Sequence, residues 1–234
     1  MMATLLLRLA APMQSWGMDS KFETRKTGRE PTKSGVIGLI AAALGVKRDD
    51  QAALERLNCL RFGVRVDQEG KLLSDYHTAK KEGKNKSENT SYVTRRYYLA
   101  DAIFLVGLES DDIALLQELK SALQTPAFSL FLGRRSCPPT FPLCLGIRQN
   151  SLEQTLREEP SLLPKWKKRT AVSMRFVLDA APHELGSTYR QDLPISFSPL
   201  HRQFGYRNAK ESMVMVPQTE PTTEHDPFIE LGGD

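Results

Sequence analysis

The chain has 234 residues, of which 40% are apolar, and a formal net charge of +4 at pH 7. This apolar content can fill a core, which excludes a disordered chain, and the length fits one large domain or a domain with an appendage. No apolar run approaches the ~20 residues that cross a bilayer. The cysteines Cys59, Cys137 and Cys144 form no CxxC pair. We therefore expect a reduced, cytoplasmic protein with no metal, cofactor or membrane partner.

Positive charge is concentrated in two segments of the chain. Residues 21–33 hold five basic and two acidic side chains, and residues 80–96 hold six basic and two acidic ones. The final segment, 217–234, has five acidic residues and no Lys or Arg. A basic surface on a nearly neutral protein favours a polyanionic partner.

The first third of the chain alternates strand and helix signals. They are a buried strand over 3–9, an apolar helix over 34–44, a charged helix over 49–57, a strand over 59–66 and its hairpin partner over 70–76. A long loop, 10–31, separates the first two. Thr32 or Ser34 can cap the apolar helix, and Gly45 can end it. In the strand over 59–66, Arg65 is expected on the face opposite to the apolar residues.

The rest of the chain begins with a polar stretch over 78–94 that lacks periodicity, which we expect to protrude. The following signals are a strong strand over 97–108, a helix over 110–123 capped by Ser110, a loop over 125–142, a strand over 143–147, a short helix over 152–158 and strands over 170–178 and 212–216 joined by a loop-rich stretch. The strong elements run βαββαβ, the order of a ferredoxin-like sheet. We expect an α+β protein with a ferredoxin-like domain over 1–148, an insertion over about 78–96, and a smaller β-rich C-terminal part over 149–234 with a frayed acidic tail.

A basic loop leads into the apolar helix. Its basic side chains are Arg25, Lys26, Arg29 and Lys33. A helix start presents unpaired N–H groups and partial positive charge, so we predict a phosphate seat at Thr32, Lys33 and Ser34. The alternative is a solvated loop before a core helix. A P-loop is excluded, because Thr32 stands where that motif needs glycine.

A second candidate is the segment Gly133-Arg134-Arg135-Ser136. Adjacent guanidinium groups can contact phosphates or base edges. Gly133 permits a backbone bend that lets a ligand approach. The alternative is a surface turn with two solvated arginines.

A third candidate is Tyr76 with His77. A histidine near pH 7 suits metal-independent RNA cleavage, in which the 2′-OH is the nucleophile. The alternative is a structural or stacking role. The remaining histidines are scattered without metal-ligand spacing.

Aromatic residues near basic ones could stack on exposed bases or fill the core. They are Trp16, Tyr76, Tyr92, Tyr97 and Tyr98. Gln14 lies two residues before Trp16 in the long loop, and Arg95 and Arg96 close the basic insertion.

Four collinear segments between Leu7 and about Leu145 resemble the CasD family, the RAMP-type subunits of CRISPR subtype I-E Cascade complexes. They read LRLAAPMQSWG, PTKSGVIGLIAAALGVKRDD, DYHT and FLGRRSCPPTFPL. The resemblance implies a RAMP core with a β-hairpin thumb inserted after the DYHT segment. It implies no enzymatic activity, since a separate subunit cuts the precursor RNA. The implied partners are the five-prime handle of the crRNA, the backbone subunit and the large PAM-reading subunit, with target DNA met indirectly.

In a related subtype the corresponding subunit cleaves the precursor RNA, so an endoribonuclease using His77 and Tyr76 stays an alternative, as does a protein–protein adaptor. For a non-catalytic RNA-binding subunit, we expect these residues at the RNA: Gln14, Trp16, Arg25, Arg29, Thr32, Lys33, Ser34, Tyr76, His77, Arg95, Arg96, Gly133, Arg134, Arg135 and Ser136.

Overall fold

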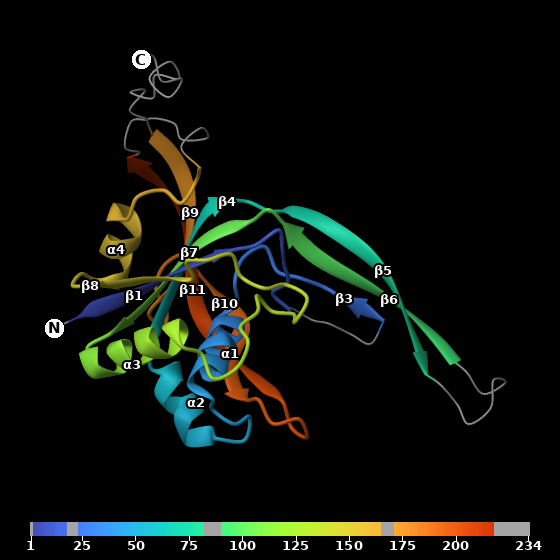
Figure 1. The fold of residues 1–234 in the computed structure, drawn as a ribbon. Helices are drawn as coiled ribbons and strands as arrows, with labels where there is room; N and C mark the ends of the chain where they lie inside the picture. Colours follow the sequence, from blue (N-terminus) through green and yellow to red (C-terminus); the bar gives the residue numbers. More distant parts are fainter. Residues whose placement is uncertain (1, 18–22, 82–89, 165–170, 218–234) are drawn as a thin grey trace, which may run out of the picture.

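A seven-stranded antiparallel sheet forms the body of the molecule, and a long hairpin projects from it (Figure 1). This computed structural model describes residues 2–17, 23–81, 90–164 and 171–217. The strand order is β10–β11–β9–β4–β7–β1–β8. The strands are β1 (Ala3–Ala10), β4 (Arg61–Gln68), β7 (Ile103–Ser110), β8 (Cys144–Arg148), β9 (Ala171–Asp179), β10 (Ser187–Ser196) and β11 (Gln203–Pro217). With the helices that pack on this sheet, the predicted α+β class is confirmed.

Helices cover both faces of the sheet. On one face lie α1 (Lys33–Leu44), α2 (Gln51–Asn58) and α3 (Ile113–Gln124), and on the other lies α4 (Leu152–Glu158). In β1, Leu5 and Leu7 join the core beneath the first three helices, whereas Leu6 packs with Leu152 and Leu156 of α4. Because both faces are covered, β1 is an unbroken apolar run instead of an alternating one.

Two glycines let α4 lie close to the sheet. A Cβ on Gly63 would come within 3.1 Å of Leu152 Cδ2, and one on Gly107 within 2.5 Å of Leu152 Cδ1. Gly63 and Gly107 are paired residues of β4 and β7, so the space they leave is continuous. Side chains at these positions would displace the helix from the sheet.

Arg65 lies on the face opposite to the apolar residues of β4, as expected, but it is fully buried. Its guanidinium group makes a two-pronged ion pair with Asp67, with distances of 2.7 and 2.9 Å. The remaining N–H groups donate to the carbonyls of Leu156, Glu159 and Pro160 at the end of α4. A buried arginine is tolerable here because five donors meet five acceptors and the cation faces a helix C-terminus.

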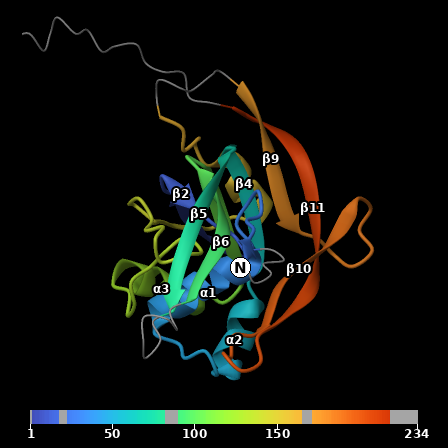
Figure 2. The same cartoon turned by 90° about the vertical axis from the view of Figure 1, so that its right-hand side faces the viewer.

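The C-terminal strands extend the same sheet. β9 pairs with β4, and Figure 2 shows β11 curving from β9 towards α2. The stretch between the two expected strands is not only loop, since it contains β10. This strand reaches α2, where the Asn58 side chain donates to the carbonyl of Pro194 at 2.6 Å.

The projecting hairpin consists of β5 (Lys71–Lys81) and β6 (Thr90–Ala100), which pair along their length. β2 (Met13–Gln14) and β3 (Thr24–Arg25) add to the other edge of β6. The predicted pairing of 70–76 with the strand over 59–66 is therefore wrong: its partner is β6. The hairpin also starts earlier than the insertion expected over 78–96, and the DYHT segment lies inside β5. Both faces of this ribbon are largely solvated, so its sequence lacks the alternation that marks a half-buried strand.

Two expected element boundaries are moved by local backbone chemistry. The predicted strand over 97–108 is broken into β6 and β7 at Asp101, whose φ is +58°, a conformation that Asp tolerates better than most residues. Helix α3 is capped by Asp112, which accepts from the Leu115 N–H at 2.9 Å. The expected cap Ser110 instead accepts from the Asp112 N–H at 3.1 Å.

The segment 218–234, expected to be a frayed tail, lies outside the described residues, as do 82–89 of the insertion. Within the described ranges, no helix is long and apolar enough to cross a membrane.

Candidate nucleic-acid interface

The start of α1 holds an internal anion. Thr32 caps the helix as predicted, its Oγ1 accepting from the Gly35 N–H at 3.2 Å, and Gly45 ends it with φ of +75°. The Lys33 N–H donates to Asp192 Oδ2 of β10 at 2.9 Å. The carboxylate of Asp192 thus takes the place that we predicted for a phosphate.

The side chain of Lys33 also has an internal partner. Its side chain is buried and its Nζ lies 3.0 Å from Asp179 Oδ2. Arg207 donates to both Asp179 and Asp192, at 2.7 Å each. Burial alone would lower the pKa of Arg207, but the hydrogen bonds and charges of Asp192 and Asp179 raise it. The predicted phosphate seat is thus corrected: Thr32 and Lys33 are buried, and Ser34 Oγ lies 3.4 Å from Thr32 Oγ1.

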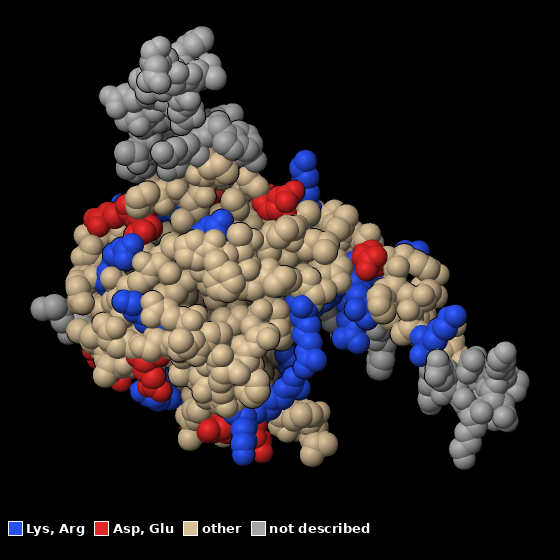
Figure 3. All heavy atoms as spheres, in the orientation of Figure 1, with Lys and Arg blue, Asp and Glu red and all other residues tan. Residues whose placement is uncertain are grey.

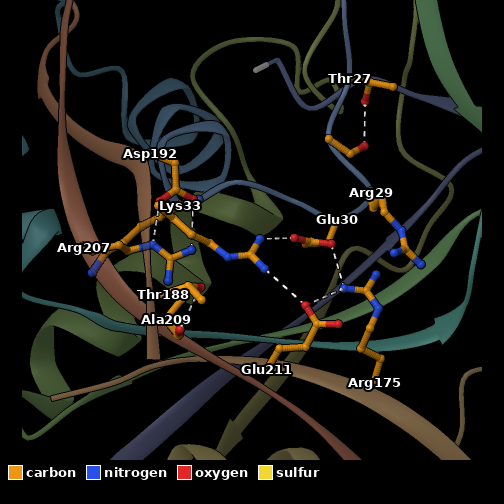
Figure 4. A network of polar contacts seen from close by, with 12 residues as sticks. Thr27, Arg29, Glu30, Lys33, Arg175, Thr188, Asp192, Arg207, Ala209 and Glu211 are labelled. Carbon is orange, nitrogen blue, oxygen red and sulfur yellow. Dashed lines mark hydrogen bonds and ion pairs between the residues drawn. The ribbon is translucent and has the colours of Figure 1, made fainter. Parts of the chain in front are cut away.

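Glu30 anchors the loop before α1 to the C-terminal strands. Its carboxylate accepts from Arg175 at 2.8 Å and from Arg190. Figure 4 shows Glu30 facing Arg175. Burial would raise the pKa of Glu30, but the hydrogen bond from Arg175 and the charge of Arg190 hold it below its ordinary value. Arg29, one residue earlier, is 74% exposed and lies 3.6 Å from Glu69.

Gln14 and Trp16, in the loop after β1, are part of the protein interior. Gln14 is fully buried, and its amide donates to the carbonyls of Leu9 and Ala102 at 3.2 and 2.8 Å. It accepts from Trp16 Nε1 at 3.2 Å, and the Trp16 ring packs against Gly35 of α1. The expectation that these two side chains contact RNA is not met, because neither is accessible.

The loop from Gly133 to Ser136 docks on this buried segment. The Ser15 N–H donates to the carbonyl of Leu132 at 3.1 Å. Gly133 has φ of +85°, and a Cβ there would lie 1.6 Å from the carbonyl oxygen of Ser15. Only glycine fits, so this residue serves the packing of two loops and not the direct approach of a ligand.

Arg134 links the docked loop to the hairpin. Its guanidinium group stacks over the Tyr98 ring at 4.5 Å and donates to the carbonyl of Arg25 at 3.0 Å. Its Nη1 is buried and, among the described residues, has no hydrogen-bond partner. Arg135 and Ser136 are exposed. A buried donor without a partner is unusual in a folded protein and indicates a position for an acceptor.

The hairpin brings further arginines to the same place. Arg25 of β3 is in register with Arg96 of β6, and Thr24 with Arg95. Arg96 Nε is also buried without a partner in the part of the chain that the structure describes. We call Arg25, Arg96, Arg134 and Arg135 the arginine cluster; Arg95, next to Arg96 in β6, points to the opposite face of the ribbon. Figure 3 shows basic side chains gathered on the side of the body that faces the hairpin.

Tyr76 and His77 do not form a joint site. They are consecutive residues of β5, where side chains alternate between faces. Tyr76 is opposite Arg95 and His77 opposite Thr94 in the ladder, so each lies with a different set of neighbours. In the described ranges, no three His, Cys, Asp or Glu residues are grouped as metal ligands.

Sequence reasoning missed the residues that fill the helix start. Asp192 is 159 positions from Lys33, and it lies in a part of the chain with weak periodicity. No local pattern connects it to the basic loop, so only the path of β10 beside α1 could reveal it.

Sequence similarity places the chain in a known protein family. Residues 4–210 match the family model described as CRISPR-associated protein (Cas_Cas5), and the chain belongs to this family. Its relatives include the CRISPR system Cascade subunit CasD of Escherichia coli (strain K12), which is 41% identical over 165 residues, 64% of this chain and 74% of the relative. The resemblance to the CasD family is thereby confirmed.

Solved structures agree with this assignment. A chain of a CRISPR RNA-guided surveillance complex superposes with a TM-score of 0.79 at 32% identity, covering 97% of this chain and 98% of that one. A structure described as a Cas protein gives a TM-score of 0.70 at 37% identity, covering 93% and 99%.

Proposed function

We propose that the chain is a non-catalytic, crRNA-binding subunit of a CRISPR type I-E Cascade complex. It holds the five-prime handle of the guide RNA at the arginine cluster and ends the filament of backbone subunits. It also adjoins the large PAM-reading subunit and meets target DNA only through the guide. The names of the relative and of the superposed complex support membership of such an assembly.

The observation that carries the RNA contact is the arginine cluster. It brings together cations from β3, β6 and the loop after Gly133, segments that are distant in sequence. Like charges at close range repel each other, so an anion would stabilise the arrangement. The exposed guanidinium groups of Arg25 and Arg135 offer charge-assisted hydrogen bonds to such an anion.

The architecture supports the same proposal. Strands β8–β1–β7–β4 lie in the order expected for a ferredoxin-like unit, with α1, α2 and α3 on one face. We take this unit as the RAMP core and the β5–β6 hairpin as its thumb. The division at residue 148 remains a prediction, because β9 continues the sheet beside β4.

The absence of catalysis is also part of the proposal. Tyr76 and His77 lie on opposite faces of β5, so they are not arranged to act on one RNA bond. Repeat RNA incubated with the protein in EDTA should stay intact. Specific cleavage that is lost in His77→Ala would contradict this part of the proposal.

The salt dependence of RNA binding tests the cluster. Arg135→Ala removes an exposed cation without disturbing the docked loop. The slope of log K against log salt should fall by about 0.7 for each lost phosphate contact. The measurement is a fluorescence titration of repeat-derived RNA between low and physiological salt.

The matched control is Arg157→Ala on α4, an exposed arginine on the other face of the sheet. Its slope should equal that of the unaltered protein. If Arg135→Ala and Arg157→Ala have equal slopes of log K against log salt, Arg135 does not contact the RNA. If the protein binds no RNA, either alone or in the assembled complex, the proposed function is overturned.

A further inference from the structure

A pocket of ≈ 610 Å³ lies between the loop before α1 and the C-terminal strands. One wall is the segment from Thr27 to Thr32, and the other is formed by β10 and β11. The residues expected at the RNA include none from these C-terminal strands. Its volume is large enough for a nucleoside-sized group.

The charged groups of this pocket are already balanced. Its lining includes three arginines and three carboxylates: Arg29, Arg175, Arg190, Glu30, Asp192 and Glu211. Glu30 pairs with Arg175 and Arg190, Glu211 with Arg190, and Asp192 with Arg207. Because these charges neutralise each other, the pocket gains little from binding another anion and suits a neutral polar group.

Two tyrosines give the pocket an aromatic rim. Tyr189 of β10 is 72% exposed, and Tyr206 of β11 is 63% exposed. Tyr189 stands opposite Asn208 in the ladder, so Tyr206 is its diagonal neighbour. Exposed aromatic faces of this kind stack on planar rings.

We propose that this pocket binds one unstacked nucleobase of single-stranded RNA. The tyrosines would stack on the base, and the carboxamide of Gln191 would supply hydrogen-bond partners for its edge. The hydroxyls of Thr27 and Thr188 already donate to the carbonyls of Gly28 and Ala209. The inference rests on the proposed function, since it assigns a second contact to the same RNA. It differs in chemistry, because the arginine cluster takes the backbone and the pocket takes a base.

The two sites are close enough to share one RNA strand. Arg25 of the cluster and Arg29 of the pocket are four residues apart in one loop. Four residues span at most about 14 Å. A short single strand leaving the cluster therefore reaches the pocket.

The test is RNA binding by the full chain with Tyr189→Ala and Tyr206→Ala combined. Loss of stacking should weaken binding of single-stranded repeat RNA by about tenfold. The salt slope should stay unchanged, because no phosphate contact is lost. The variant with both tyrosines changed to Phe should keep most of the affinity, since the rings remain.

The matched control is Met213→Ala, an exposed residue of β11 outside the pocket lining. It should bind RNA like the unaltered protein. Photocrosslinking with 4-thiouridine-substituted RNA should join the RNA to a peptide of β10 or β11.

Outcomes separate the pocket from the proposed function. If Arg135→Ala changes the salt slope but the tyrosine variant binds and crosslinks normally, the pocket inference is overturned and the function stands. If the tyrosine variant binds RNA normally but fails to enter the assembled complex, the pocket receives a protein segment, which also overturns the inference. If the unaltered protein binds no RNA, both fail.

Discussion

Gly133 and Arg134 show how a single loop can serve both packing and binding. Gly133 brings its backbone against Ser15, and this contact fixes the next residue over Tyr98. Arg134 is thus held in one orientation, by its stacking on Tyr98 and its hydrogen bond to the carbonyl of Arg25. A fixed guanidinium group loses less conformational entropy on binding than a free surface arginine.

Substitution of Gly133 should therefore affect binding through geometry. Gly133→Ala places a Cβ on the Ser15 carbonyl at a positive φ, so the loop must move. We expect the free energy of unfolding to fall by more than about 1 kcal/mol and RNA affinity to fall with it. Chemical denaturation and RNA titration measure the two effects.

Gly17→Ala is the control for this experiment, because a Cβ there meets no atom within 4 Å. It should leave both quantities unchanged. A Gly133→Ala protein with unaltered stability and RNA affinity would show that the docked loop does not need its close contact.

At the scale of elements, helix α1 depends on β10. Asp192 accepts from the Lys33 N–H and from two nitrogens of Arg207, so one carboxylate joins the helix start to β11 as well. The anion that stabilises this helix is supplied by the protein itself. The basic loop before the helix is consequently held by internal ion pairs, and its exposed cations are placed by them.

Removing this carboxylate should destabilise the protein strongly. Asp192→Asn leaves the buried charge of Arg207 partly uncompensated, for a loss of about 3 kcal/mol. Thermal and urea unfolding measure it. Asp112→Asn at the start of α3 is the control, because asparagine caps a helix about as well as aspartate. If both variants lose the same free energy of unfolding, Asp192 contributes no more than an ordinary helix cap.

Across the whole molecule, ion pairs fasten the N-terminal loop to the C-terminal strands. Glu30 bonds to Arg175 of β9 and Arg190 of β10, and Arg175 in turn bonds to Glu69 at 2.8 Å. These contacts hold together parts of the chain that are 145 and 160 residues apart. The wall of the pocket depends on these ion pairs, because Glu30, Arg175 and Arg190 line it.

This arrangement predicts a pH dependence of stability. The pKa of Glu30 is lower in the folded protein than its ordinary value of 4.5. Its contribution is therefore present above about pH 4.5 and is lost as pH falls through the folded pKa. Glu30→Gln should be less stable at neutral pH and should lose less stability on acidification. Denaturation curves between pH 7 and pH 3 measure this.

Glu118→Gln, which changes an exposed surface pair on α3, should follow the pH dependence of the unaltered protein. If the free energy of unfolding falls equally steeply with decreasing pH in Glu30→Gln and in the unaltered protein, other carboxyl groups cause the acid sensitivity.

Much of the fold follows from local sequence. Thr32 and Gly45 mark α1, the periodicity marks α3, and the apolar runs mark β1 and β7, because caps and side-chain periods act over a few residues. The GRRS segment was also recognisable as a candidate, since adjacent arginines after glycine are a local feature. The hairpin escaped recognition because a ribbon solvated on both faces has no apolar alternation.

The tertiary structure alone decided which of the candidate residues are free to bind. Lys33 and Thr32 look like a phosphate seat in sequence, yet Asp192 occupies the helix start from 159 residues away. Gln14 and Trp16 look accessible in a long loop, yet both are buried. Sequence determines which side chains can bind an anion, but long-range pairing determines which of them already have a partner, because burial and ion pairs are properties of the assembled chain.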